Sequence, residues 1–184
     1  MCNVKYTFSE DGSVAYGHLP DGIVFMVDTA SLDKIAGISF YRNYRDLTGK
    51  ILYVMDRHRK QLHRHLVDVP KGYEVDHINL DTLDNRLCNL RICTHQQNQC
   101  NQPRQRNNTS GVTGVSFYKP RGKYRARIKI CQHDIHLGYY QTFEEAVQAR
   151  NVGMACMFGD YGRYDEVEEI PPWIEEDVIN RCKR

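Results

Sequence analysis

The sequence contains no apolar run long enough to cross a membrane, and its first residues, MCNVKYTFSEDG, lack the basic-then-apolar layout of a signal peptide. These absences predict a protein that stays in the cytoplasm, where it is made. The seven cysteines form no C-x-x-C pair, and Cys88, Cys93 and Cys100 do not have zinc-ribbon spacing. We therefore expect reduced thiols, with a structural zinc as the weaker alternative.

Little net charge is present, but the charge is unevenly distributed. The chain has 184 residues, 41% of them hydrophobic, which is enough for one ordinary domain or two to three small modules. Residues 1–100 carry 12 basic and 12 acidic side chains, residues 101–140 carry eight and one, and residues 141–184 carry five and ten. The short cationic block predicts a polyanion-binding face.

The stretch 73–98 combines an Asp-His pair with spaced asparagines. Thr94 stands three residues before Gln97, the Thr-x-x-Gln pattern of a capping box, so a helix is predicted to begin at His95. Alternation before it predicts strands over 73–77 and 89–93, separated by a polar loop over 81–85.

This scaffold places oxygen donors where a metal ion could bind. Magnesium takes few protein ligands, prefers oxygen and keeps water or phosphate in its other positions. Asp76 and the Asn98 amide would supply two such donors from opposite walls. His77 follows Asp76 on a strand, so it points to the other face and is available as a base.

The pattern DH-x7-NR-x2-NLR-x6-N, from Asp76 to Asn98, resembles the HNH motif of ββα-metal nucleases, in the form found in phage and intron-encoded homing endonucleases. The resemblance implies that His77 is the general base and that Asp76 and Asn98 hold one divalent metal, Mg²⁺ or alternatively Mn²⁺. It also implies that Asn89 holds the His77 side chain. A degenerate, inactive copy is the alternative.

The upstream segment 62–67, LHRHLV, is similar to a His-Arg strand of such enzymes, although His65 stands where an apolar residue is usual. We place His63 and Arg64 of this segment among the candidate DNA contacts.

Residues 1–60 look β-rich, with turn signals at Asp11-Gly12, Asp21-Gly22 and Thr48-Gly49 and a last strand over 50–55. They contain no catalytic constellation, so we expect them to support the nuclease module, residues 61–101, or to touch DNA. The most plausible DNA contacts in this region are Arg57, His58, Arg59 and Lys60. The alternative is that these residues form a solvated charged turn.

A polar, basic linker is expected over 102–110. In the sequence KYRARIKI, residues 123–130, basic and apolar residues then alternate strictly, which predicts a strand with one cationic face and one core face. Flanking β-prone runs and a Thr142–Glu145 capping box predict three antiparallel strands covered by one helix that ends near Gly159.

The block 111–164 resembles the plant APETALA2/ethylene-response-factor DNA-binding domain through its GV-x-GV, KYRARI, IHLGY and EEA-x-x-AR segments, with Tyr124 where tryptophan is commoner. That family lays its sheet in the major groove. A solvated strand face is the alternative. The resemblance implies six candidate contacts: Tyr118, Lys119, Arg121, Arg125, Arg127 and Lys129.

The predicted fold class is α+β: a small ββα-metal nuclease module, preceded by a β-rich region and followed by a three-stranded antiparallel sheet packed on one helix. An acidic tail over 165–184 contains a short helix opened by Pro171-Pro172. The predicted function is a metal-dependent DNA endonuclease of the HNH homing type, acting as a monomer on double-stranded DNA in a bacterial or phage-infected cell, with no membrane partner. A non-catalytic DNA-binding regulator is the alternative.

Overall fold

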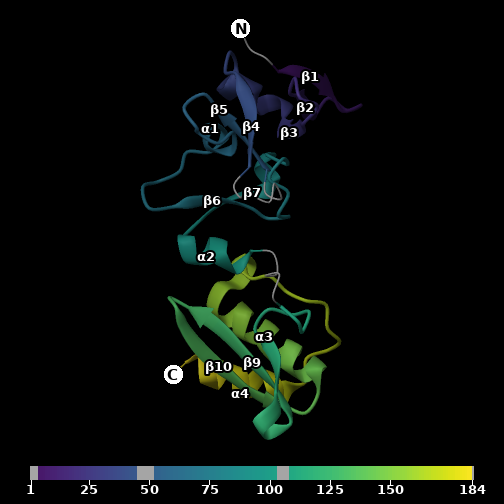
Figure 1. The fold of residues 1–184 in the computed structure, drawn as a ribbon, viewed down its shortest axis with the longest axis vertical. Helices are drawn as coiled ribbons and strands as arrows, with labels where there is room; N and C mark the ends of the chain where they lie inside the picture. Colours follow the sequence, from purple (N-terminus) through teal and green to yellow (C-terminus); the bar gives the residue numbers. More distant parts are fainter. Residues whose placement is uncertain (1–3, 45–51, 103–107, 184) are drawn as a thin grey trace. The chain divides into compact units, whose positions relative to one another are not determined.

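The computed structural model describes residues 4–44, 52–102 and 108–183 and divides the chain into two compact units, Met1–His95 and Gln96–Arg184 (Figure 1). Each unit is described by itself. The expected Thr48-Gly49 turn, the first residues of the expected strand 50–55 and the centre of the expected linker lie outside the described residues.

The first unit begins with an antiparallel sheet of β1 (Lys5–Phe8), β2 (Val14–His18) and β3 (Val24–Asp28), followed by the 3₁₀ helix η1 (Thr29–Ile35). A two-stranded sheet of β4 (Phe40–Tyr44) and β5 (Leu52–Asp56) comes next. Glycines with positive φ form the first two turns as predicted, Gly12 at 70° and Gly22 at 87°.

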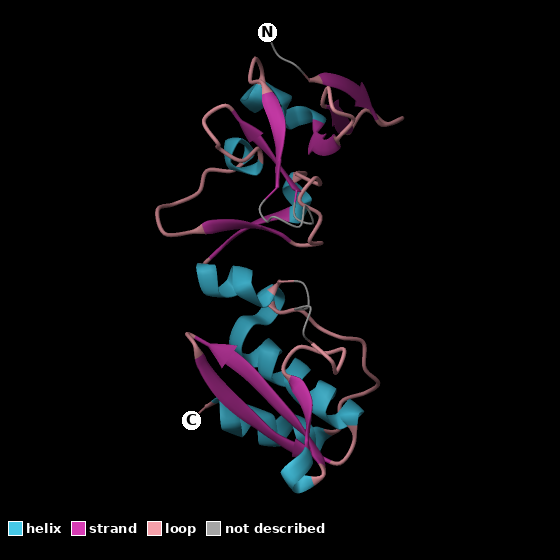
Figure 2. Cartoon of the chain, in the orientation of Figure 1, coloured by secondary structure: helices cyan, strands magenta, loops and turns pink. Residues whose placement is uncertain are grey.

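The expected ββα arrangement is confirmed by β6 (Glu74–His77), β7 (Leu90–Cys93), which follows the short η2 (Leu87–Asn89), and α2 (His95–Cys100). The two strands pair antiparallel, with Asp76 opposite Arg91 and His77 opposite Leu90. Figure 2 shows the pair and the helix after it.

The predicted strand over 62–67 is wrong, because this segment forms the helix α1 (His63–Leu66). Leu62, His63 and Leu66 are all buried. Positions i, i+1 and i+4 share one side of a helix, whereas a strand would point His63 away from both leucines.

One hydrophobic core serves the whole first unit. Phe25 and Val27 of β3, Phe40 of β4 and Val54 of β5 pack in the same buried cluster as Val75 and Leu90 of the ββα strands. The β-rich region therefore supports the nuclease module directly, as predicted.

The second unit contains a sheet in the order β10-β9-β8, formed by β8 (Val115–Tyr118), β9 (Lys123–Ile130) and β10 (His133–Tyr140), with the short η3 (Lys119–Arg121) between the first two. Helix α3 (Phe143–Phe158) packs on one face of it, and the predicted capping box between Thr142 and Glu145 is present. The three-stranded sheet covered by a helix is thus confirmed (Figure 1).

The C-terminal segment is part of this core. After η4 (Gly159–Tyr161), helix α4 (Pro172–Cys182) buries Ile174 and Val178 completely in the cluster that holds α3 and the sheet. No helix in the described ranges combines the length and the apolar character that a membrane span needs. The mixed α and β architecture agrees with the predicted fold class.

Candidate active site and nucleic-acid interface

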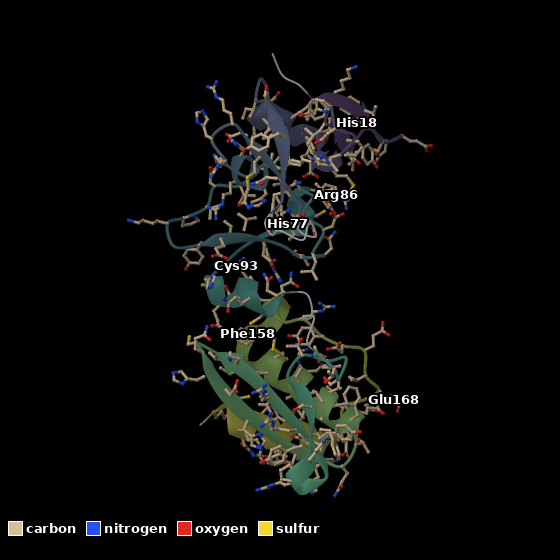
Figure 3. The ribbon with its side chains drawn as sticks, viewed as in Figure 1. His18, His77, Arg86, Cys93, Phe158 and Glu168 are labelled. Carbon is tan, nitrogen blue, oxygen red and sulfur yellow. The ribbon has the colours of Figure 1, made fainter. Side chains whose placement is uncertain are left out.

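His77 ends β6 with its side chain buried, 4% exposed (Figure 3). Its Nε2 lies 3.2 Å from Oδ1 of Asn85. The amide nitrogen of Asn85 donates to the carbonyl oxygens of Leu83, at 3.1 Å, and Thr82, at 3.4 Å, which orients Oδ1 toward the ring. Because an amide oxygen can only accept, Nε2 carries the proton and Nδ1 is the basic nitrogen.

Burial lowers the pKa of His77, against the opposing effects of the Asn85 hydrogen bond and of the carboxylates of Asp76, Asp81 and Asp84. A lowered pKa keeps the imidazole neutral around neutral pH. The geometry therefore presents an oriented, neutral imidazole.

Two further rings surround this base. His63 of α1 stands edge to face with His77, with ring centroids 5.0 Å apart and an interplanar angle of 82°. Tyr53 of β5 lies 6.0 Å from His63 and 6.3 Å from His77, again between centroids.

His63 is 3% exposed, and burial, followed by the charges of His77 and Arg64, lowers its pKa to about 3. A buried neutral ring cannot serve as a cationic contact to a phosphate. The burial of His63 does not favour the expected DNA contact, which stays a prediction, as does that of Arg64, which is partly exposed.

Asn89 shapes the turn after His77. Its Nδ2 donates to the Asp84 carbonyl oxygen at 2.7 Å, its Oδ1 accepts from the Asn79 amide at 2.9 Å, and its own carbonyl accepts from the Ile78 amide at 2.9 Å. The structure thus assigns to Asn85 the ring contact that the resemblance gave to Asn89. Asn85 is the asparagine of the Asn-Arg pair in the motif, and this pair is the sequence feature that could have indicated its role.

The loop that carries Asn85 is fixed from two sides. Asp84, 1% exposed, accepts two side-chain hydrogen bonds from Arg86, each 2.7 Å, and these contribute most to lowering its pKa. Main-chain hydrogen bonds join Met26 of β3 to Leu83 and to Asn85, both at 2.8 Å. The N-terminal sheet therefore holds the Asn85 loop in register.

Asp76 is 5% exposed, and Arg91, its cross-strand neighbour, donates two hydrogen bonds to its Oδ2, from Nε at 2.9 Å and from Nη2 at 2.7 Å. Such paired contacts fix a carboxylate and balance its charge. Sequence reasoning assigned no role to Arg91.

The donor chemistry of Asp76 and Asn98 fits a hard divalent cation, which accepts carboxylate and amide oxygens and keeps several waters. Asn98 lies on α2 at the start of the second unit, so its pairing with Asp76 on one ion stays a prediction. Within residues 4–44, 52–102 and 108–183 there is no cluster of three or more His, Cys, Asp or Glu side chains able to hold a metal.

The exposed face of the second unit's sheet brings basic and aromatic side chains together. The guanidinium of Arg121 lies 4.5 Å from the Tyr139 ring centroid and that of Arg125 5.5 Å from the Tyr118 centroid, while the two tyrosine rings are 5.2 Å apart. The ring of His136 lies tilted against that of Tyr139, with centroids 4.5 Å apart. The sequence reading had identified neither Tyr139 nor His136, because their basic neighbours lie on other strands.

The remaining predicted contacts lie around this cluster. Lys119 and Lys129 are exposed, whereas Arg127 pairs with Asp134 at 2.6 Å. The predicted cationic face of β9 is therefore present, with one of its charges already matched by an acidic residue.

Comparison with known proteins identifies the class of the site. Residues 57–100 match the HNH endonuclease family model. The chain is 38% identical over 60 residues to Protein 3.8 of Escherichia phage T7, which covers 33% of this chain and 50% of that protein. It is 29% identical over 145 residues to the uncharacterized HNH endonuclease L560 of Acanthamoeba polyphaga mimivirus, covering 75% of this chain and 74% of that protein.

Residues 57–100 are thus similar to the HNH endonuclease domain, whose family generally uses a divalent metal ion, and the chain matches about half the length of the phage protein. These findings support a DNA-cleaving hydrolase. No solved structure matches the chain.

Proposed function

We propose that the protein is a metal-dependent DNA endonuclease of the HNH homing type, which hydrolyses phosphodiester bonds to leave a 5′ phosphate and a 3′ hydroxyl. The observation that carries the proposal is the state of His77: buried, held at Nε2 by Asn85, and therefore basic at Nδ1.

In the reaction, Nδ1 of His77 accepts a proton from a water molecule, and the oxygen of that water attacks the phosphorus in line with the departing 3′ oxygen. Asn85 keeps the accepting nitrogen oriented and its proton on the opposite side of the ring. Histidine in this role usually contributes about 10²–10⁴-fold in rate.

Asp76 and Asn98 would hold the divalent ion, Mg²⁺ or Mn²⁺, which when bound supplies positive charge to the phosphate and the leaving oxygen. Arg91 holds Asp76 by its Oδ2 atom. The carboxylate therefore does not need to reorganise when the ion binds.

The second unit would bind double-stranded DNA with its exposed sheet face. Arg125 supports this assignment because its guanidinium lies over the Tyr118 ring, beside the matching pair of Arg121 and Tyr139. The arginine-tyrosine stacks provide flat surfaces for bases or sugars, and the basic side chains neutralise phosphates.

Supercoiled plasmid incubated with magnesium, with manganese or with a chelator tests the proposal. We expect nicked or linear DNA with either metal and intact plasmid with the chelator, and a ligase that requires 5′ phosphate and 3′ hydroxyl ends should reseal the nicks. His77→Ala should cut about 10²–10⁴-fold more slowly at similar DNA affinity.

His18→Ala is the matched control, because His18 lies on β2 and bonds Thr7 away from the site. A mobility shift without cutting under all metal conditions would instead identify a DNA-binding regulator.

A further inference from the structure

The ring of His63 has no assigned part in the proposed reaction, yet it lies against the base. Both rings are nearly inaccessible, His63 at 3% and His77 at 4%, and they meet edge to face at 5.0 Å. We infer that His63 is a positioning residue that sets the rotation of the His77 ring by this edge-to-face contact, an assignment that rests on the proposed function.

Rotation of an imidazole about its Cβ–Cγ bond is broad and roughly two-fold. A flip would exchange Nε2 with a carbon and break the Asn85 hydrogen bond, so this bond opposes the flip but leaves the tilt of the ring less restricted. The Asn85 contact holds Nε2. The edge-to-face contact with His63 restricts the tilt of the His77 ring, which places Nδ1 in one direction.

The neighbouring elements hold His63 in a fixed position. The Leu62 amide donates to the carbonyl oxygen of Val54 at 2.9 Å, which ties the start of α1 to β5. Leu62 and Leu66, each 1% exposed, anchor the same short helix in the core. Tyr53, also from β5, contacts both imidazoles.

The charge state of His63 fits packing rather than substrate binding. Its pKa, lowered to about 3 by burial, leaves it neutral at working pH. A neutral partner adds no positive charge beside a group that must accept a proton. His63 thus orients the base without competing with it.

Two variants of His63 separate ring packing from a merely apolar role. His63→Phe keeps an aromatic ring, whereas His63→Leu keeps apolar volume without one. We expect the single-turnover cleavage rate of His63→Leu to fall about tenfold, a part of the 10²–10⁴-fold that the base contributes, at unchanged DNA affinity. His63→Phe should stay within about threefold of wild type, because rotamer packing is retained.

Nitrogen-15 spectra of the His77 ring in the intact chain provide a readout that stability alone does not move. Wild type and His63→Phe should show the proton on Nε2, and His63→Leu should show averaging between tautomers. A full rate and an unchanged His77 spectrum in His63→Leu would overturn the inference. So would a loss in His63→Phe as large as in His63→Leu, since a ring nitrogen would then be required.

The failure of the proposed function looks different. If His77→Ala cuts DNA at the wild-type rate, the base assignment itself fails whatever the His63 variants do. If His77→Ala is inactive and His63→Leu is unaffected, only the positioning role of His63 is lost.

Discussion

The two units place their polar residues in opposite ways. Among its described residues, the first buries five aspartate and histidine side chains, Asp56, His63, Asp76, His77 and Asp84, and three of them lie in or against the ββα strands. The second has exposed and partly exposed basic residues on one sheet face, although it buries Arg150. Burying ionisable groups costs stability unless they are paired, and Asp56, Asp76 and Asp84 are paired with His65, Arg91 and Arg86.

The buried polar residues of the second unit have a different task. Gln148 and Asn151 of α3 donate to the main-chain oxygens of Glu169 and Asp165, at 3.2 and 2.8 Å, and Arg150 bonds the carbonyl of Arg163. These contacts supply hydrogen bonds to main-chain carbonyl groups of the segment that leads to α4, and they tie that segment to α3. Buried polar side chains thus hold chain connections in the second unit, whereas in the first they surround the His77 ring.

The largest effect should come from removing the buried carboxylate. Asp76→Ala deletes the charged metal donor and leaves Arg91 without its partner, so we expect a rate loss of about 10²-fold or more and weaker metal binding. Asn98→Ala should be milder, because a neutral amide contributes less. Cleavage against magnesium concentration, with calorimetric metal titration, measures both.

Asp68→Ala is the control, since Asp68 is an exposed aspartate in the loop after α1. Metal titrations that match wild type in both site variants would show that the ion is held elsewhere.

The next effect compares two buried asparagines. Asn85→Leu removes the hydrogen bond to His77, and we expect the cleavage rate to fall about 10- to 100-fold, as for other groups that orient a reactive side chain. Asn89→Leu removes two main-chain contacts of the turn, so it should lower the melting temperature with a smaller rate effect on folded protein. The reverse ranking of rates would return the ring contact to Asn89.

Local patterns predicted much of this molecule from sequence. Alternation located β6, β7 and β9, and the Thr142–Glu145 pair located the start of α3, because these features depend on near neighbours. Motif spacing also singled out Asp76 and His77.

The errors concern contacts between distant segments. The segment 62–67 has leucines that are compatible with both a strand and a helix, and only packing under β5 selects the helix and buries His63. Which asparagine contacts His77 depends on the path of the loop that carries Asn85. Main-chain hydrogen bonds to β3 determine that path. A sequence pattern contains neither piece of information.

A third prediction tests the cost of the buried histidine. The pKa of His63 is lowered to about 3 in the folded chain, against about 6.5 unfolded. Between pH 6.5 and 3 the unfolded state binds a proton at this residue and the folded state does not. The contribution of neutral His63 to the free energy of unfolding is therefore complete above pH 6.5 and is lost as the pH falls toward 3.

Between pH 7.5 and 5 the free energy of unfolding should therefore decrease by about 2 kcal/mol on account of His63. His63→Phe should remove this part of the decrease, and urea unfolding of both proteins at the two pH values measures it. Parallel decreases in the two proteins would show that His63 is protonated in the folded state.

The smallest effect concerns the exposed face of the second unit. Each phosphate neutralised by a basic side chain contributes about one unit to the salt slope of DNA binding. The guanidinium of Arg125 lies over the Tyr118 ring, whereas Arg127 is paired with Asp134 and must leave it before it can pair with a phosphate. We therefore expect Arg125→Ala to reduce the slope by about one and Arg127→Ala by less, and the double variant by at most about two.

Affinity measured against salt on a preferred site and on random duplex DNA distinguishes how these arginines act. Phosphate contacts weaken binding to both duplexes alike, whereas an arginine that reads a guanine edge costs about 1–3 kcal/mol on the preferred site and little on random DNA. Asp134→Ala sharpens the test, because it releases Arg127 from its ion pair. The contribution of Arg127 to the salt slope of DNA binding should then increase in magnitude. Slopes that are unchanged in all these variants would mean that the basic face of β9 is a solvated surface, and the DNA-binding role of the second unit would have to be assigned to another part of it.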